Sequence, residues 1–289
     1  MGNRPGPVLV TGANSGIGLA TVLLLARRGW DAWGTVRSED KAATLRQAAA
    51  AAGVEARVTP LVLDVADDEA VIARWPELPA FYGVVNNAGY SELGAVEEVS
   101  AAQARAQLDV NVVAPAVVSG CALPAMRERG AGRIVMVSSI AGRAAILPLN
   151  GWYHASKFAL EALSDVLRME VAGFGVRVSI VEPGFFKTGI GASARDLADA
   201  RIGTDGSPYA AAYRRSRVGL EAIERLAPPP DAVARVIVAA VESRRPLRRY
   251  LVGVDAMSLA STQPLIPRAL TDAATRLMSG LGGGPGTYT

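Results

Sequence analysis

Short apolar runs alternate with longer segments of helical pattern over the first two-thirds of the chain. Each short run is rich in valine, isoleucine and leucine on both faces, which is typical of a strand buried in a parallel sheet. Six strands are expected there, at residues 8–11, 32–36, 57–63, 81–86, 133–137 and 176–181. This alternation predicts an α/β fold: a doubly wound, Rossmann-like parallel sheet with helices on both faces.

The segments between these runs favour helices. They are expected from the first glycine turn to about residue 28, and at 40–52, 101–129 and 151–173. Pro115 and Pro124 are expected to break or bend the long helix, because proline lacks the N–H that a helix needs. Gly173 is expected to end the last of these helices.

The last third of the chain departs from this alternation. Residues 190–227 are rich in small, charged and glycine residues without a clear strand, and we interpret them as a small helical substrate lid. A surface helical pair without a ligand role is the alternative. A helix is expected at 231–242, a final strand at 249–254, which brings the sheet to about seven strands, and an amphipathic helix at 266–278. We therefore expect one domain over 1–280 and a flexible tail at 281–289.

Composition excludes several kinds of site. Half of the residues are apolar and 20% are charged, so the chain can bury a core. The formal net charge of +3 comes from scattered basic residues, which disfavours nucleic-acid binding but suits an anionic cofactor. One cysteine, Cys121, and one histidine, His154, leave no set of ligands for a structural zinc and no internal disulfide. His154 is interpreted as incidental, because no G-x-S-x-G elbow accompanies it.

The sequence also shows no recognisable targeting signal. No apolar run with a cleavage site precedes the first strand, and no uncharged stretch has the length of a membrane span. We expect a cytoplasmic protein without an integral membrane segment.

A glycine-rich turn, Thr11-Gly-Ala-Asn-Ser-Gly-Ile-Gly18, joins the first strand to the first helix. Glycines let the backbone approach a pyrophosphate, and the helix N-terminus offers free N–H groups and a positive dipole end. A dinucleotide site is the functional interpretation, and a turn that only packs helix on strand is the alternative. Arg37 follows the second strand, where an acidic residue would favour NAD(H). Its planar fork suits a 2′-phosphate, so we expect NADP(H) rather than NAD(H), unless Arg37 is simply a solvated surface residue.

Tyr153 and Lys157 stand four residues apart and would share one face of a helix. A nearby ammonium lowers the pKa of a phenol, which could make Tyr153 a proton donor and acceptor near neutrality. Interconversion of an alcohol and a carbonyl needs such a group. The spacing alone also fits a half-buried tyrosine beside a solvated lysine.

The ordered motifs resemble those of the short-chain dehydrogenases/reductases over about residues 7–190. The matching segments are the turn 11–18, Asn86-Asn87-Ala88-Gly89, Asn111, Ser138-Ser139, Tyr153 with Lys157, and Pro183-Gly184 with Thr188. Thr35-Val36-Arg37 and the segment 182–188 resemble the hydroxysteroid and retinol dehydrogenase branch.

The resemblance implies catalytic roles for four residues. Ser139 would hydrogen-bond the substrate oxygen, Tyr153 would transfer the proton, Lys157 would hold the nicotinamide ribose and depress the tyrosine pKa, and Asn111 would position a water. Ser138 is the competing serine, because the gap to Tyr153 is about one residue longer than usual. The implied cofactor-binding residues are Gly12, Asn14, Ser15, Gly16, Ile17, Gly18, Arg37, Asp64, Val65, Asn87, Ala88, Gly89, Tyr153, Lys157, Pro183, Gly184 and Thr188.

The function implied is that of an NADP(H)-dependent ketoreductase or alcohol dehydrogenase, acting on a lipophilic ketone or secondary alcohol. Apolar residues before Tyr153 (Ile146, Leu147, Leu149 and Trp152) and Phe185 and Phe186 would line its pocket. An NADPH-binding redox-sensing regulator without turnover is the alternative. A nucleotide-sugar epimerase fits less well, since its usual G-x-x-G-x-x-G turn is absent. By the same resemblance, the helices at 101–129 and 151–173 would form a homodimer or homotetramer.

Overall fold

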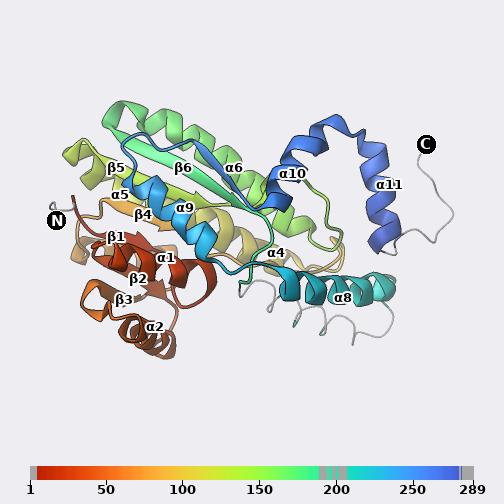
Figure 1. Cartoon of the computed structure of the whole chain (residues 1–289), viewed down its shortest axis with the longest axis horizontal. Helices are drawn as coiled ribbons and strands as arrows, with labels where there is room; N and C mark the ends of the chain where they lie inside the picture. Colours follow the sequence, from red (N-terminus) through yellow and green to blue (C-terminus); the bar gives the residue numbers. More distant parts are fainter. Residues whose placement is uncertain are drawn as a thin grey trace.

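Seven parallel strands form one sheet in the order β3-β2-β1-β4-β5-β6-β7 (Figure 1). The computed structural model describes residues 5–188 and 207–279 and the single positions 194, 196, 200 and 281. The strands are β1 (Val8–Val10), β2 (Ala32–Val36), β3 (Val58–Val62), β4 (Gly83–Asn86), β5 (Gly132–Val137), β6 (Val176–Pro183) and β7 (Arg249–Val252). The order reverses between β1 and β4, and such a switch point opens a crevice at the carboxyl edge.

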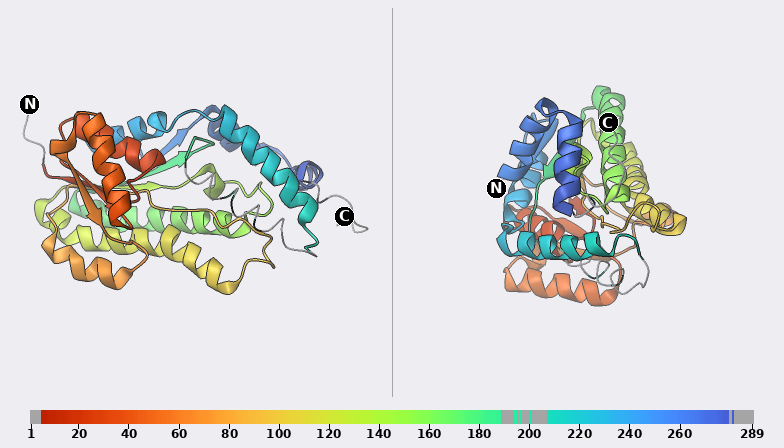
Figure 2. Two further views of the ribbon diagram at one scale, coloured as in Figure 1. Left: turned by 90° about the horizontal axis from the view of Figure 1, so that it is seen from below. Right: turned by 90° about the vertical axis from the view of Figure 1, so that its right-hand side faces the viewer.

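Helices cover both faces of the sheet, which confirms the predicted doubly wound fold (Figures 1 and 2). One face carries α1 (Gly16–Arg27), α2 (Glu39–Ala51) and α9 (Asp231–Glu242), and the other carries α3 (Asp68–Arg74), α5 (Ala114–Arg129) and α6 (Gly151–Val171). The strands are apolar on both sides for this reason. Val8 and Val10 enter the first core, and Leu9 between them enters the second.

The long helix predicted at 101–129 is interrupted directly before Pro115. It consists of α4 (Ala101–Leu108), a π-helical turn (Asp109–Val113) and α5. Pro115 lies in the first turn of α5, whereas Pro124 lies inside α5 without breaking it. The break predicted at Pro115 is therefore confirmed, a break at Pro124 was wrong, and Asn111 occupies the π-helical turn.

The predicted end of α6 at Gly173 was also wrong. The α-helix ends at Val171, a 3₁₀ turn covers Ala172–Phe174, and Gly175 is the residue with a left-handed backbone, at φ +74°. A Cβ at Gly175 would lie 2.0 Å from the carbonyl oxygen of Gly130, so the site requires glycine.

The stretch from Ala101 to Arg129 is the one helical segment of the described residues that is long and apolar enough to cross a membrane. Length and composition alone give this result. Val118, Ala122 and Met126 of the stretch are buried against the sheet core.

Three C-terminal helices lie beyond the carboxyl edge of the sheet (Figures 1 and 2): α8 (Ala210–Leu226), α10 (Val254–Thr262) and α11 (Arg268–Ser279). The beginning of α8 is anchored by Tyr213, which is fully buried among Leu93, Ala95 and Leu149. Its hydroxyl accepts a hydrogen bond from the amide of Ala95 at 2.8 Å. Most of the predicted lid before residue 207, and the predicted tail after Leu281, lie outside the described residues.

Candidate active site

The glycine turn after β1 takes the shape that a bound pyrophosphate requires. Gly12 and Gly16 have left-handed backbones, with φ of +67° and +53°. A Cβ at Gly18 would lie 2.2 Å from the carbonyl oxygen of Gly12. The amide of Gly12 donates to Thr35 Oγ1 at 3.2 Å, which ties the turn to β2. Ser15 precedes α1 without capping it, so its side chain does not occupy the first helical N–H groups.

Side-chain hydrogen bonds fix this turn to the end of β4. Thr11 Oγ1 accepts from the amides of Asn87 at 3.0 Å and Ala88 at 2.9 Å. Asn87 Nδ2 donates to the carbonyl oxygens of Thr11 at 2.9 Å and Gly12 at 3.2 Å. Asn86 Nδ2 donates to Ser119 Oγ at 2.9 Å. Thr11 and Asn86 thus act as internal braces, and the Asn87 amide does the same.

Tyr153 and Lys157 share one face of α6 at the carboxyl edge of β5. The Lys157 ammonium lies 5.8 Å from the centre of the Tyr153 ring and donates to the carbonyl oxygen of Val137 at 3.0 Å. Lys157 is buried, whereas Tyr153 keeps partial exposure to the cavity. The sequence spacing therefore does bring the phenol and the ammonium together.

The protonation of the pair differs from the simple expectation. Burial raises the pKa of Tyr153 above its ordinary value, and a hydrogen bond with the Ser139 side chain is what opposes this rise. Burial lowers the pKa of Lys157 to about 8, opposed by the carboxylate of Glu161. The predicted depression of the Tyr153 pKa by Lys157 was therefore wrong for the protein alone, because desolvation dominates.

The two neighbouring serines after β5 face different partners. Ser139 lies beside Tyr153, and its hydroxyl accepts from the amide of Ala141 at 3.1 Å. Ser138 is buried, and its hydroxyl lies beside the carboxylate of Glu161 on the next turn of α6 after Lys157. Both serines line the cavity, and Ser139 is the one that lies beside Tyr153.

Asn111 connects the π-helical turn to α6. Its Nδ2 donates to the Tyr90 carbonyl oxygen at 2.9 Å and to Ser156 Oγ at 3.0 Å, and its Oδ1 accepts from the Tyr90 amide at 3.1 Å. A Cβ at Gly89 would lie 3.1 Å from Asn111 Oδ1 and 3.7 Å from the Lys157 ammonium. Gly89 thus marks the point where Asn111 and Lys157 approach each other.

One cavity of about 170 Å³ joins the predicted cofactor and catalytic residues. The predicted site residues on its lining are Ile17, Asn87, Gly89, Ser139, Tyr153, Lys157, Pro183, Gly184 and Thr188. The other predicted site residues lie outside that lining: Gly12, Asn14, Ser15, Gly16, Gly18, Arg37, Asp64, Val65, Ala88 and Asn111. After the neighbouring strands, Arg37 is exposed beyond β2, Asp64 Oδ1 accepts from the amide of Ala66, and Val65 is buried. The carboxyl edge therefore holds the predicted dinucleotide residues along β1 to β3 and the predicted chemistry beside β5 and β6.

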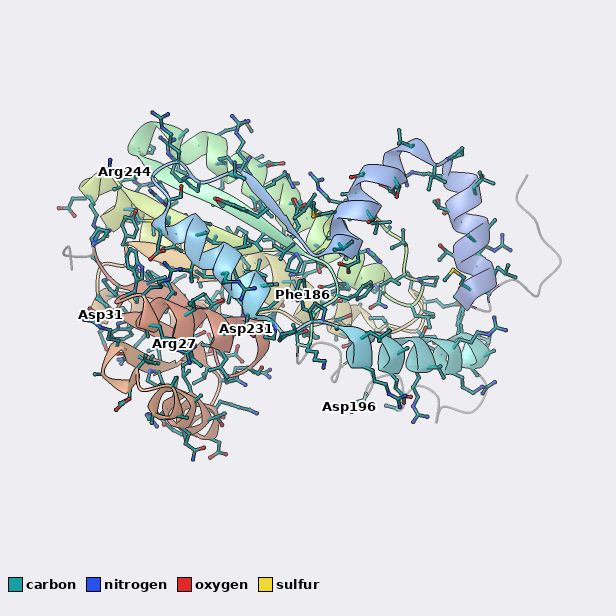
Figure 3. All side chains as sticks on the ribbon, in the orientation of Figure 1. Arg27, Asp31, Phe186, Asp196, Asp231 and Arg244 are labelled. Atoms are coloured by element: carbon teal, nitrogen blue, oxygen red, sulfur yellow. The ribbon has the colours of Figure 1, made fainter. Side chains whose placement is uncertain are left out.

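The substrate side of the cavity is apolar, as expected. Ile146, Leu147, Phe185 and Phe186 line it, while Leu149 is buried under α8 and Trp152 lies outside the lining. Phe186 lies where the sheet meets the C-terminal helices (Figure 3). The amide of Phe185 donates to Asp255 of α10 at 2.6 Å, so α10 helps to hold this wall.

His154, interpreted as incidental from the sequence, is a structural part of the site. It is buried, lines the cavity, and uses both ring nitrogens on the backbone of the segment before α6. The sequence shows it as the only histidine, but nothing in its spacing predicts that Ala141 and Leu147 lie against it.

A partly buried ion-pair network behind Tyr153 and Lys157 was also not foreseen. Arg249 of β7 pairs with Glu161 and Asp165 of α6 and with Glu182 of β6, the last at 2.7 Å. Arg143 pairs with the same fully buried Glu182 at 3.0 Å. Three elements are joined here, which fixes α6 relative to the ends of β6 and β7.

Comparisons with known proteins agree with this geometry. The model of the short chain dehydrogenase family matches residues 7–198. Retinol dehydrogenase 5 of Homo sapiens is 32% identical over 285 residues, which cover 92% of this chain and 86% of that protein.

Solved structures show the same fold with either dinucleotide. A short chain dehydrogenase/reductase of Burkholderia phymatum in complex with NAD has a TM-score of 0.75 at 25% identity, covering 100% of this chain and 99% of that one. A metagenomic short-chain oxidoreductase in complex with NADP has a TM-score of 0.66 at 25% identity, covering 86% and 97%. The family match, the retinol dehydrogenase relative and the sheet order agree: the chain belongs to the short-chain dehydrogenase family, in the branch that resembles the retinol dehydrogenases, and is an oxidoreductase acting on CH–OH groups.

Proposed function

We propose that this enzyme interconverts a lipophilic ketone and its secondary alcohol with NADP(H), and that Tyr153 is the acid/base. The observation that carries the proposal is the shared cavity. Ile17 of the glycine turn and the polar groups of Ser139, Tyr153 and Lys157 line one space, whose remaining walls are largely apolar. A carbonyl held there would lie against both the dinucleotide site and the proton donor.

The residues present fit a nicotinamide dinucleotide. The turn leaves no room for a side chain at Gly18, and α1 directs its N-terminus towards the same edge. Arg37 makes no hydrogen bond or ion pair within the described residues, so its guanidinium is available to a 2′-phosphate. When bound, such a cofactor supplies or accepts the hydride.

Side chains of the protein then bind the carbonyl oxygen of the substrate and transfer the proton to it. In the reducing direction, negative charge develops on the carbonyl oxygen, which Ser139 and Tyr153 hold by hydrogen bonds. Tyr153 donates its proton to that oxygen, and a phenol of raised pKa is fully protonated for this step at neutral pH. The nearby Lys157 ammonium stabilises the phenolate that remains.

Replacement of Tyr153 by phenylalanine tests the proposal. The Tyr153→Phe variant should bind NADPH as the wild type does but lose about 10²–10⁴-fold in kcat, because an acid/base step of that size is removed. The assay follows NADPH oxidation with a panel of aryl and long-chain aliphatic ketones. Tyr82→Phe is the matched control, since Tyr82 is buried against Trp30 and lies outside the cavity lining. Retained turnover in Tyr153→Phe would reject the assignment of Tyr153 as the acid/base.

Replacement of Arg37 tests the preference for NADPH over NADH. The Arg37→Asp variant should lose at least about tenfold in preference for NADPH over NADH, because a carboxylate repels the 2′-phosphate and accepts ribose hydroxyls. Arg27→Asp makes the same charge change at the far end of α1 (Figure 3) and should leave the preference unchanged. Equal ratios of kcat/KM for the two cofactors in wild type and Arg37→Asp would reject the role of Arg37.

We infer a homo-oligomer formed through the outer faces of the π-helical turn and α6. Val113, Phe158, Val166 and Met169 expose between 43% and 70% of their surface there, and contact with a second copy would bury these apolar side chains. Sedimentation velocity of the wild type and of a Phe158→Glu variant tests this inference.

A further inference from the structure

The apolar wall of the cavity has little regular structure of its own. It is formed by the segment 140–150 between β5 and α6, which begins with one 3₁₀ turn (Ile140–Gly142) and then has no helix or strand. Ile140, Ala141, Ala144, Ile146 and Leu147 of this segment line the cavity. Its shape must therefore be set by bonds to residues outside it.

His154 supplies two of these bonds from the first turn of α6. Its Nδ1 lies 2.9 Å from the Ala141 carbonyl oxygen, and its Nε2 lies 3.3 Å from the amide nitrogen of Leu147. A carbonyl can only accept and an amide can only donate, so Nδ1 carries the proton and Nε2 does not. The geometry thus requires one neutral tautomer, and burial lowers the pKa of His154, which keeps the ring neutral at pH 7.

Other contacts also hold the segment. Arg143 pairs with Glu182, the carbonyl oxygen of Leu149 accepts from the Gly94 amide at 2.7 Å, and Asn150 Oδ1 accepts from Ser91 Oγ at 2.8 Å. The stretch from Ala141 to Leu147, which includes Arg143, is in addition held at both of its ends by the two nitrogens of a single ring. That ring belongs to the residue next to Tyr153.

We propose that His154 is a positioning residue for substrate selection: by fixing Ala141 and Leu147 to one imidazole, it sets the apolar wall that a carbonyl compound must fit to reach Tyr153. This proposal deepens the proposed function and rests on it. His154 touches neither the reacting atoms nor the dinucleotide turn, so its effect falls on substrate fit rather than on cofactor binding.

Three variants distinguish the effects of the two hydrogen bonds that His154 makes. In His154→Asn the side-chain amide lies near the place of Nδ1 and can keep the bond to Ala141. In His154→Gln the amide reaches the place of Nε2 and can keep the bond to Leu147. His154→Phe keeps the bulk of the ring and loses both bonds.

The expected result is a graded loss of substrate fit. With a bulky aryl ketone, KM should rise by up to about tenfold for each lost bond, so most in His154→Phe and less in the Asn and Gln variants. Selectivity for the bulky ketone over a small one should fall in the same order, while the Kd for NADPH stays at the wild-type value. Unchanged KM and selectivity in a folded His154→Phe protein would overturn the proposal. If that variant does not fold, wild-type KM and selectivity in both His154→Asn and His154→Gln would overturn it equally.

Nitrogen-15 NMR supplies a test that does not need turnover. The chain has one histidine, so the imidazole signals of the labelled protein belong to His154 without further assignment. The expected pattern at pH 7 is a protonated Nδ1 and an unprotonated Nε2. An Nε2–H tautomer or an imidazolium would overturn the proposal by itself, whereas absence of ketone reduction by the wild type would reject only the proposed function.

Discussion

Lys157 keeps an ammonium inside the protein, 4% exposed, and this has an energetic cost that depends on pH. Burial lowers its pKa to about 8 from an ordinary 10.5. Below pH 8 the lysine is protonated in both the folded and the unfolded chain, so it adds no pH dependence there. Between pH 8 and 10.5 the unfolded chain binds more protons, so the free energy of unfolding rises with pH.

We predict that this rise disappears in the Lys157→Met variant. The free energy of unfolding of the wild type, minus that of the variant, should increase by on the order of 3 kcal/mol from about pH 7.5 to 10.5, at about 1.4 kcal/mol per pKa unit. Urea unfolding at several pH values, without added cofactor, measures this difference. A flat difference would mean that Lys157 is hydrated or paired in solution.

Individual residues show what the sequence can and cannot reveal about the site. The spacing of Tyr153 and Lys157 and the glycines at 12, 16 and 18 were readable, because chemistry and backbone geometry restrict which residues can stand there. The raised pKa of Tyr153 could not be predicted from the sequence, because desolvation depends on everything that surrounds the phenol. His154 was missed for a related reason: its partners are backbone atoms, and backbone atoms leave no mark on a sequence.

The C-terminal end of α6 is determined by one glycine rather than by the helix itself. Gly175 reverses the chain into β6 with a left-handed backbone and packs on the Gly130 carbonyl, whereas Gly173 has open space around its Cα. These two glycines, two residues apart, form a natural control pair.

We predict that Gly175→Ala lowers the free energy of unfolding by more than about 1–2 kcal/mol, the cost of a left-handed alanine, because the methyl group also collides with Gly130. Gly173→Ala should be neutral or raise it by up to about 1 kcal/mol, since alanine restricts the unfolded chain. Thermal and urea unfolding of both variants measure the effect. Equal stabilities would show that the turn can rearrange.

Strand and helix types were predictable where the pattern is clear: short runs apolar on both faces for the buried strands, and a helical period for α9. The residues at which these strands and helices end were less predictable. The π-helical turn at Asp109–Val113 coincides with the bonds from Asn111 to Tyr90 and Ser156, which come from distant parts of the chain. Arg249, likewise, belongs to an apparently simple strand but pairs with carboxylates of α6 and β6. Such pairings arise only once the sheet is assembled.

At the scale of the whole molecule, side-chain hydrogen bonds tie the C-terminal helix α8 to the loop after β4 and to α11. The beginning of α8 is tied to residues 95–98, since the Tyr213 hydroxyl accepts from the Ala95 amide and donates to Glu98, and Tyr209 donates to Glu97. Arg215 of α8 donates to the Leu277 carbonyl oxygen of α11 at 3.2 Å. Leu220 of the same helix lines the cavity.

We predict that Tyr213→Phe loosens α8 without unfolding the sheet. The variant leaves the buried Ala95 amide without the hydroxyl that accepts its hydrogen bond, which costs about 1–3 kcal/mol. Hydrogen–deuterium exchange should therefore accelerate about tenfold or more in α8 and remain unchanged in β4 and β5. Tyr250→Phe, which removes a hydroxyl from β7, should leave α8 at the wild-type rate.

Leu149, beside the substrate wall, is the one described non-glycine residue with a left-handed backbone, at φ +65°. Such a conformation stores about 1–3 kcal/mol, and here burial beneath α8 and the bond to Gly94 maintain it. The strained backbone of Leu149 persists because Ala212 and Tyr213 of α8 pack on its side chain and the Gly94 amide binds its carbonyl oxygen. The packing of α8 and the conformation of the segment before α6 are therefore energetically coupled.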